Sequence, residues 1–429
     1  MDVKDLASQM DALWVMVAAI LVISMQAGFA LLESGSVRMK NASHVAAKQV
    51  LSFAIATIAF WAFGFAITFG EGNRMFGTSG WFVESADAFR SLDWAHVPLS
   101  LKFLFQLAFA AVSLAIAWGG FAERAKLSVY ITFGFLFTVL IYPVIGHWVW
   151  GGGWLASLGM QDFAGSTVVH LQGAIAALIA TLLLGPRIGK FNENKTPNKI
   201  PGHNQVYTVL GGFILWFGWF GFNAGSTMGT ADGFFGFVAM TTNLAAAAGA
   251  LGALLAAKWF TGVADVPAMV NGILAALVAI TASCAYVEAW AAVLIGLIAG
   301  AVTFWTSVYF EKKGVDDPLN AFSVHGIAGI LGTLSTGFFA SPRLVEQNGI
   351  GKPGLFYGGG FHQLGIQLIG VLGAAIYVAV VSFIILYILK KTIGLRVTRE
   401  EELNGLDISE HGEYGYPEHL RLKPWREAK

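Results

Sequence analysis

Two histidines lie within long apolar stretches of the sequence, where a titratable side chain is unusual. His170 lies in "DFAGSTVVHLQGAIAAL", and His325 lies in "FSVHGIAGILGTL". An imidazole can donate, accept or relay a proton near neutral pH, and ionisable groups in membrane helices usually face a packed interior or a pathway. One buried histidine alone is more simply a packing residue that bonds to a backbone carbonyl. The matched pair favours a pathway that handles protons.

The residues before His170 indicate a polar stripe on one helix face. Asp162, Ser166 and His170 recur at every fourth position, and small residues continue the same face. At about 1.5 Å per residue, His170 lies roughly 12 Å below Asp162, near the middle of a hydrocarbon layer of about 30 Å. His325 lies roughly 9 Å in from the other side by the same estimate, and because span boundaries are uncertain by about 2–4 residues, the two rings can come into contact. Asp162 can also N-cap its helix, and a cap or scaffold role stands at least equal to direct ligand contact.

Aromatic residues gather in other apolar segments. Phe222 and Ser226 share a helix face in "GWFGFNAGS", Phe109 follows another phenylalanine by four residues, and Trp150 ends a further segment. Each aromatic residue alone is more simply a core or interfacial residue. The cluster, however, suits a small cation that donates hydrogen bonds, because aromatic faces attract cations and a hydroxyl or carboxylate accepts N–H donors.

The apolar path beyond these aromatic residues disfavours a charged solute. Moving a bare ion into low dielectric costs on the order of 20 kcal/mol in the idealised limit. Desolvation therefore favours loss of a proton from the cation. A neutral amine can then pass the imidazole pair, which handles the proton.

The composition identifies a membrane protein. Of the 429 residues, 56% are hydrophobic and only 12% are charged, whereas soluble domains carry about 25% charged residues. The formal net charge of zero indicates no attraction to nucleic acid. The single cysteine, Cys284, excludes an intramolecular disulfide and a cysteine-held metal cluster. With only two deep histidines and no thiolate set, a metal or haem enzyme is disfavoured.

The sequence predicts an all-α polytopic protein with 11 transmembrane helices, because the template of about 20 apolar residues fits that often. The acidic N-terminus argues against a cleaved signal, so the first segment is a retained span. Basic residues fall on alternate connections, which predicts an outside N-terminus and a cytoplasmic C-terminus. The expected spans are 11–34, 50–70, 100–121, 128–150, 162–184, 205–224, 235–257, 268–284, 288–310, 319–340 and 362–389.

The histidine segments also suggest an inverted repeat of helices 1–5 and 6–10. Each segment carries a histidine followed by a ladder of small residues, in the fifth and tenth expected helices. Inverted repeats place a transport site where the halves meet, near the midplane. Small residues are common wherever membrane helices pack, so this signal is weak by itself.

The chain divides into a transmembrane domain, 1–393, and a cytoplasmic C-terminal tail, 394–429. The tail switches to charged composition, and Thr398 with Glu401 three residues later forms the pattern of a capping box. This predicts a short helix in a partly ordered tail. The alternative, a solvated charged tail, stays open.

Several motifs together resemble the ammonium transporter (Amt/Rh/Mep) family, and within it the Amt branch. The resemblance covers nearly the whole chain, and the ordered set is highly specific. It runs through "ALLESGSVRMKNA", "FQLAFAAVSLAIAWGGFAERAKL", "HWVWGGGWLAS", "DFAGSTVVH", "GWFGFNAGS", "DDPLNAFSVHGIAG" and "GLRVTREEELNGLDISEHGE".

The resemblance implies a homotrimer of 11-helix protomers in the cell's inner (plasma) membrane, each with its own pore that conducts ammonia derived from ammonium. It implies no enzyme activity, cofactor or metal. The tail resembles a regulatory region that contacts the neighbouring protomer and binds a PII-type signal protein such as GlnK. The family's site residues match this sequence as follows: Phe109 and Phe222 as the gate; Phe109, Trp150 and Ser226 as the recruitment site, supported by Asp162; and His170 and His325 as the pore histidines.

Two departures from the family pattern lie away from these motifs. "TASCAYVEAW" lacks the proline or glycine that many relatives carry beside the cysteine, which puts the helix break there in question. The final "PEHLRLKPWREAK" runs beyond the familiar tail motif. An alternative function is an ammonium sensor that signals through its tail with little flux, although no kinase or cyclase domain follows the tail.

Overall fold

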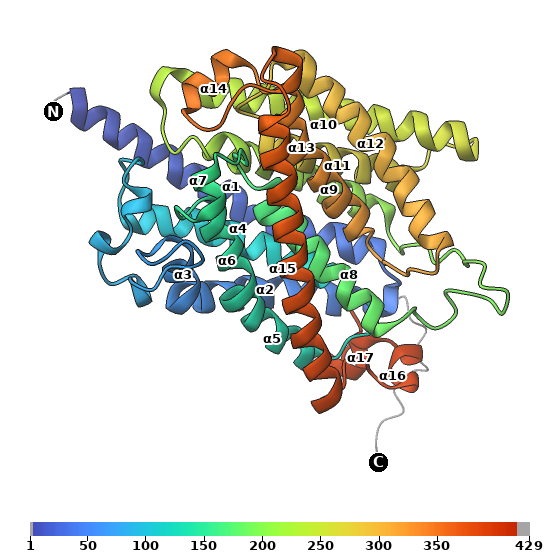
Figure 1. Cartoon of the computed structure of the whole chain (residues 1–429). Helices are drawn as coiled ribbons and strands as arrows, with labels where there is room; N and C mark the ends of the chain where they lie inside the picture. The colour runs from blue at the N-terminus through green and yellow to red at the C-terminus, as the bar shows by residue number, and fades with distance from the viewer. Residues whose placement is uncertain (1–2, 418–429) are drawn as a thin grey trace.

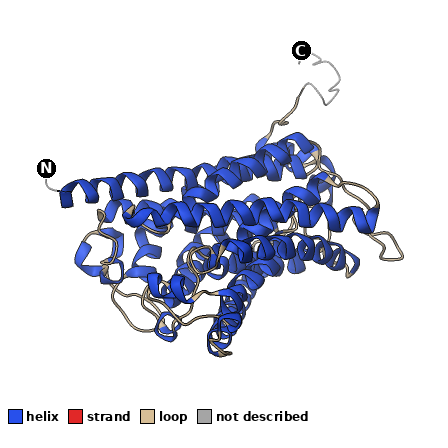
Figure 2. Ribbon diagram, turned by 90° about the horizontal axis from the view of Figure 1, so that it is seen from above, coloured by secondary structure: helices blue, strands red, loops and turns tan. Residues whose placement is uncertain are grey.

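The protein is almost entirely helical. The structure is a computed structural model that describes residues 3–417, and these residues include no β-strand. Within this range, 11 helices are long and apolar enough to span a membrane. The prediction of 11 membrane helices is therefore confirmed, and the helices form one bundle when viewed from the side and from above (Figures 1 and 2).

The first five spans contain several breaks in regular α-helix. A π-helical turn interrupts the second and fourth spans and begins the fifth span. The elements are α1 (Val3–Ser36); α2 (Ala42–Ala59), η2 (Phe60–Gly64) and α3 (Phe65–Phe69); α4 (Leu99–Gly119); α5 (Leu127–Leu136), η6 (Phe137–Ile141), α6 (Tyr142–Val149) and the short α7 (Trp154–Leu158); and η7 (Ser166–Leu171) with α8 (Gln172–Leu184).

The remaining six spans include two further π-helical turns. One ends the sixth span and the other begins the tenth span. The elements are α9 (Gln205–Trp219) with η8 (Phe220–Ala224); α10 (Phe234–Thr261); α11 (Val266–Ser283); α12 (Ala289–Lys312); η10 (Phe322–Ile327) with α13 (Ala328–Phe339); and α15 (His362–Thr392).

The long helix α15 runs from one end of the bundle to the other. The short helix α14 (Pro342–Asn348) lies at one end, and α16 (Arg399–Asn404) and α17 (Leu406–His411) lie at the other (Figure 1). We call these ends the vestibule face, which carries α14, and the tail face, which carries α16 and α17.

Glycines allow α10, α11 and α12 to pack closely. A Cβ added to Gly249 would lie 2.4 Å from the carbonyl oxygen of Gly272, and one added to Gly300 would lie 2.1 Å from that of Gly249. No side chain fits at these distances. Close backbone approach through small residues is a common way for membrane helices to associate, since apolar side chains gain little by leaving lipid.

Many large apolar side chains are exposed around the bundle. In water, such a surface would favour aggregation, but in a membrane it can contact lipid acyl chains. It includes Val50 and Ile58 on α2, Phe213 and Phe217 on α9, Leu251, Leu255 and Trp259 on α10, and Leu372, Ile376 and Phe383 on α15.

Buried charges at the tail face form a connected cluster. Arg38 Nε lies 2.8 Å from Glu123 Oε1, and Arg187 also pairs with Glu123. Arg187 Nη2 lies 2.8 Å from Asp316 Oδ1. Burial raises the pKa of the Glu123 carboxyl, but Arg187 and Arg38 outweigh this effect and lower the pKa to about 2. The cluster therefore ties together the connections after the first, third, fifth and ninth spans.

The tail packs against this face as two short helices. Thr398 Oγ1 accepts a bond from Glu401 N while Glu401 Oε2 accepts one from Thr398 N, so the predicted capping box is confirmed. Lys40 Nζ donates to the carbonyl of Glu402 at 2.6 Å, and Asp407 accepts from the backbone N–H of His44 at 2.8 Å. The alternative of a solvated tail is wrong for residues 394–417. The extension from 418 to 429 lies outside the described residues.

The helix break at "TASCAYVEAW" is present without a proline or glycine. Helix α11 ends at Ser283, Cys284 follows as its C-cap, and the chain then turns. The freed carbonyl of Ala282 accepts a bond from Phe163 N at 3.1 Å. This contact joins the break to the loop that precedes His170.

Candidate functional site

The two predicted pore histidines lie in contact. The Nδ1 atoms of His170 and His325 are 3.3 Å apart, and the rings are nearly parallel at 12° with centroids 5.4 Å apart. His170 is fully buried and His325 is 6% exposed. The expectation that the two rings can come into contact is therefore confirmed.

Each histidine lies in a π-helical turn at the start of its span. His170 belongs to η7 and His325 to η10, in the fifth and tenth spans. A π-turn leaves the regular hydrogen-bond ladder and often marks a functional position. The shared π-turn agrees with the predicted correspondence between these two helices. Sequence periodicity could not reveal it, because a π-turn and an α-turn differ by one residue.

The paired ring nitrogens favour one proton arrangement. When one Nδ1–H donates to the other Nδ1, a neutral pair presents an acceptor Nε2 on one ring and a donor Nε2–H on the other. His170 Nε2 is buried and has no hydrogen-bond partner among the described residues. The pair can therefore accept a proton at one end while it releases one at the other.

Aromatic rings support His170 on the vestibule side. Trp219 stacks on the imidazole at 5.1 Å and 13°, and its Nε1–H donates to Thr281 Oγ1 at 2.8 Å. Phe222 lies 5.4 Å from the imidazole centroid. These contacts hold the ring orientation without a hydrogen bond to His170 Nε2. The role of Trp219 in orienting His170 was not predicted from the sequence.

Two stacked phenylalanines separate the histidines from the vestibule face. The rings of Phe109 and Phe222 are 4.1 Å apart at 27°, and both side chains are buried. Phe222 belongs to η8, a third π-turn at this site. The structure thus brings together the two residues predicted to form a gate.

A cavity of about 710 Å³ opens on the other side of this stack, at the vestibule face. Its lining includes all four predicted recruitment residues: Phe109, Trp150, Asp162 and Ser226. The Trp150 ring lies 6.2 Å from Phe109, and Ser226 Oγ donates to the Phe222 carbonyl at 2.8 Å. The serine oxygen is then free to accept a bond from a ligand.

Among the polar residues of this vestibule that the sequence did not reveal, Gln106 is the one with an unpaired buried oxygen. Gln106 lines the cavity, and its Oε1 is buried without a hydrogen-bond partner among the described residues. An unpaired buried carbonyl is costly and suits a ligand that donates N–H bonds. Its position between two phenylalanines in "FQLAF" is the signal that could have identified it.

Asp162 does not lie on the helix that carries His170, so the predicted stripe is wrong at its start. Gly165, with φ of 112°, ends the loop, and the helix begins at Ser166. The Asp162 carboxylate instead accepts backbone N–H bonds, which is the cap role that the sequence left open. The donors are Gly165, Ser166, Thr167 and Val168, at 3.0, 2.8, 2.9 and 3.0 Å.

Ser166 also departs from the predicted stripe. Its Oγ donates to the Val278 carbonyl at 2.6 Å and accepts from Ala282 N at 2.7 Å. The hydroxyl therefore joins the helix start to the end of α11 and does not face the histidines' path. Together with Asp162, it fixes where the helix of His170 begins.

Replacing Asp162 with alanine should lower both stability and transport. The change leaves four buried N–H groups without their acceptor, and each orphaned donor costs roughly 1–3 kcal/mol before relaxation. We expect a fall of several degrees in the apparent unfolding temperature of the purified protein and a matching loss of ammonium uptake. Exposed Asp93→Ala is the control. Wild-type stability and uptake in Asp162→Ala would contradict this role.

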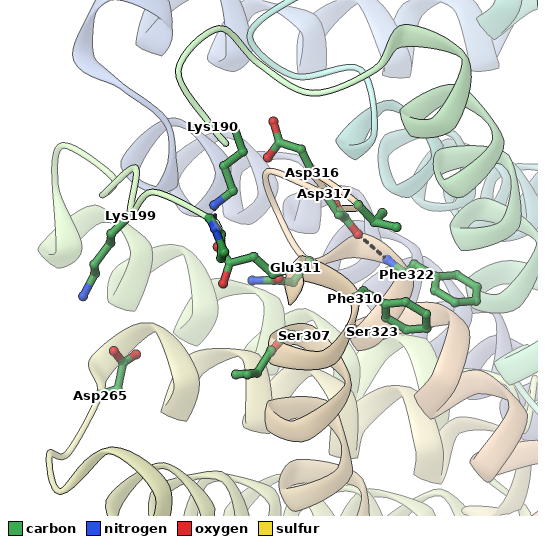
Figure 3. Close-up of a pocket in the computed structure, with 14 residues that line it drawn as sticks. Lys190, Lys199, Asp265, Ser307, Phe310, Glu311, Asp316, Asp317, Phe322 and Ser323 are labelled. Carbon is green, nitrogen blue, oxygen red and sulfur yellow. Dashed lines mark hydrogen bonds and ion pairs between the residues drawn. The ribbon is translucent and has the colours of Figure 1, made fainter. Parts of the chain in front are cut away.

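A second pocket, of about 370 Å³, opens at the tail face beside η10 (Figure 3). Asp317 Oδ2 accepts from Phe322 N at 2.8 Å and so caps the start of the helix that carries His325. Lys190 pairs with Glu311 on the wall of the same pocket. The tail-face end of η10 is therefore polar.

Comparisons with known proteins agree with this architecture. The family model described as "Ammonium Transporter Family" matches residues 13–416. "Ammonium transporter Amt2" of Archaeoglobus fulgidus is 44% identical over 421 residues, covering 95% of this chain and 88% of that protein. "Ammonium transporter" of Bacillus subtilis is 39% identical over 415 residues, covering 96% and 99%.

Solved structures are similar over nearly their whole length. One described as "Sensor Amt Protein" has a TM-score of 0.89 and 36% identity, covering 95% of this chain and 100% of that one. The crystal structure of Candida albicans Mep2 has a TM-score of 0.87 and 31% identity, covering 97% and 92%.

Proposed function

The chain belongs to the ammonium transporter family and is an ammonium transporter, and we propose that it separates ammonium into ammonia and a proton that cross by way of the histidine pair. The family consists of transporters and channels, so the chain is not an enzyme. The observation that carries the proposal is the 3.3 Å contact between His170 and His325 behind a closed aromatic stack.

Ammonium binds in the vestibule, next to the aromatic stack. The faces of Phe109 and Trp150 attract the cation, at about 0.5–2 kcal/mol per contact depending on desolvation. The oxygen of Ser226 accepts one of its N–H bonds. Asp162 contributes by holding the backbone around this site, since its oxygens are already occupied by N–H donors.

Ammonium loses its proton to the histidine pair at the point where the cation meets the two phenylalanines. Between Phe222 and the imidazoles, no charged side chain of the described residues is in contact with the His170 ring, and burial of an unpaired cation costs several kcal/mol even after relaxation. Desolvation therefore favours ammonia over ammonium. Ammonia passes the rings, the proton moves along the paired nitrogens, and one positive charge crosses with each ammonia.

The vestibule face is outside and the tail face is cytoplasmic in this proposal. Basic residues such as Arg38, Lys40, Arg124 and Arg187 gather on the tail face, as the positive-inside bias requires. The protein is a multi-pass membrane protein, placed here in the cell's inner (plasma) membrane as a homotrimer. Residues 394–429 act as a regulatory tail that can bind a PII-type protein such as GlnK.

Ammonium flux into liposomes tests the transport proposal. The purified protein in sealed vesicles should give ammonium-dependent uptake well above that of empty vesicles. Membrane-impermeant methylated quaternary ammonium should give none, because it has no proton to lose. Uptake of the quaternary cation at the ammonium rate would overturn the deprotonation step.

A second candidate, ammonium sensing, is favoured by two observations. One similar structure is described as "Sensor Amt Protein", and the tail is packed against the bundle through Lys40 and Asp407, where it can respond to changes in the spans. Saturable ammonium binding without flux in the same vesicles would favour sensing. Flux above that of empty vesicles favours transport.

Removing the Phe222 ring should weaken selection for ammonium. Phe222→Ala opens the stack with Phe109, so water and hydrated cations can reach His170. We expect the ratio of ammonium-evoked to potassium-evoked current to fall by about tenfold or more, because the apolar barrier of several kcal/mol is lost. Phe60→Ala, an equally buried ring outside the vestibule lining, is the matched control. An unchanged ratio in Phe222→Ala would rule out this gate.

A further inference from the structure

A small cavity adjoins His325 on the tail-face side of the histidine pair. Its volume is about 20 Å³, which is enough for one water molecule. Its polar lining comes from His325, Glu33 and Asn271, and the rest of the lining is apolar. A buried water needs two to four polar partners, and these three side chains can supply them.

Glu33 lies one helical turn beyond a residue that contacts His325. The Phe29 ring lies 6.4 Å from the His325 ring. Glu33 follows four positions later on α1, and therefore lies on the same face and roughly 6 Å further along the axis. The Glu33 side chain is 3% exposed. The carboxylate is thus placed beside the pore and past the histidines.

The Glu33 carboxylate is only half satisfied. Lys48 Nζ lies 2.5 Å from Oε2, and Gln49 Nε2 donates to the same oxygen at 2.9 Å. Both of these contacts fall on Oε2, no hydrogen bond between described residues involves Oε1, and Glu33 lines the cavity beside His325. The opening beside His325 leaves this oxygen able to accept a further bond.

The groups around Glu33 and its partner Lys48 come from five other elements. Lys48 and Gln49 lie on α2, and Lys48 Nζ also donates to the Trp118 carbonyl of α4 at 3.3 Å. Asn271 lies on α11, and His325 on η10. Lys48 also lies 5.9 Å from the ring centroid of Tyr130 on α5. A buried ion pair is weak evidence for stability, whereas an ionisable group inside a membrane helix marks function.

We propose that Glu33 is the proton acceptor that follows His325 on the way to the tail face. This inference rests on the proposed proton-coupled function. The Nε2–H bond of His325 breaks as the water in the cavity takes that proton, and the water passes another proton to Glu33 Oε1, where an O–H bond forms. Glu33 then releases the proton to the solution at the tail face.

Ammonia and the proton recombine after this step. Ammonia leaves the pore uncharged and takes up a proton from the solution at the tail face. Per cycle, one N–H bond of ammonium breaks at the vestibule and one forms at the tail face. The Glu33 carboxylate returns to its starting state, the imidazoles are again neutral and regain their starting tautomers when the rings reorient, and one positive charge has crossed.

The test measures current and ammonia entry on the same vesicles. Ammonium pulses evoke a current on supported membranes, and an internal pH dye reports ammonia that enters without its proton, because such ammonia raises the internal pH. Four preparations are compared with wild type: Glu33→Gln, Glu33→Gln with Lys48→Met, Asn271→Leu, and Glu311→Gln. The last is a control carboxylate of the same face, which pairs with Lys190.

In the two Glu33 variants, we expect the ratio of current to ammonia uptake to fall at least tenfold relative to wild type. We also expect the internal pH of these vesicles to rise. In Asn271→Leu, the same ratio should fall several-fold, although the Glu33–Lys48 pair stays intact. This variant keeps the test decisive if the Glu33 variants do not fold. Glu311→Gln should match wild type. Wild-type current in the double variant would overturn the proposal, because any loss in Glu33→Gln alone would then come from an unpaired Lys48.

The same run separates the two proposals. If wild type conducts ammonia without current, proton coupling fails and the Glu33 relay fails with it. If wild type and the folded variants all carry equal current, only the relay fails. Wild-type current in folded Asn271→Leu would likewise exclude a water held by that side chain.

Discussion

Replacing His170 with alanine should reduce the ammonium-evoked current at least tenfold. His170 Nδ1 lies 3.3 Å from His325 Nδ1, and in the proposed relay the proton passes between these two atoms. The substitution removes the proton donor or acceptor at this point. A positioned acid or base contributes about 10²–10⁴-fold to proton transfer. Proteoliposomes on a supported membrane give the measurement directly.

Folding should be affected far less than current by this change. His170 makes one side-chain hydrogen bond, and the ring is otherwise held by packing on Trp219 and Phe222. We expect the apparent unfolding temperature to stay within about 5 °C of wild type. His203→Ala, a histidine of the tail face that bonds to the Val37 carbonyl, controls for loss of an imidazole. Wild-type current in folded His170→Ala would show that the pair does not relay protons.

Replacing Arg187 with methionine should have the largest effect on stability. Arg187 is 5% exposed and pairs with both Glu123 and Asp316, which are themselves buried. Removing one partner from a buried ion pair leaves an uncompensated charge and typically costs about 3–5 kcal/mol. We expect a marked fall in the apparent unfolding temperature and in the amount of folded protein recovered from membranes.

Arg343→Met is the matched control for this change. Arg343 pairs with Glu288 at 3.1 Å, but its side chain is 60% exposed. Solvent-exposed pairs contribute little, typically 0–1 kcal/mol, so this variant should unfold close to wild type. Equal effects of the two substitutions would mean that the tail-face cluster does not hold its four connections together.

The histidine pair could be predicted from the sequence because depth along a span follows from residue count. Counting placed both His170 and His325 deep in the layer, within reach of each other given the uncertain span boundaries, and the structure has them in contact. The pairing of Phe109 with Phe222 followed from the family resemblance and not from helical spacing, and the two rings lie together. Long apolar helices constrain position strongly, since each must cross the same layer.

The sequence pattern placed Asp162 and Ser166 on one helix face with His170, which the structure does not show. Their spacing from His170 fits an α-helix, but Gly165 adopts a positive φ, and the following turn is π-helical. A glycine in "DFAGSTVVH" is compatible with either a helix or a break. The bonds that decide between them involve Val278 and Ala282, more than 100 positions away in sequence.

In the tail, likewise, the local helix start could be predicted from the sequence, but the contacts with distant residues could not. The capping box at Thr398 was visible in four residues and is present. Its docking depends on Lys40 and His44, near the other end of the chain. No periodicity or charge pattern connects these segments, so an ordered tail was predictable but its binding surface was not.

In the proposed mechanism, ammonia and a proton cross separately but in equal number. The most direct measurement is the ratio of charge to ammonia, from current and uptake recorded on the same wild-type vesicles. We expect one elementary charge per ammonia, because each ammonium loses its proton to the histidine pair and that proton also crosses. Ammonium-dependent uptake with no accompanying current would contradict it.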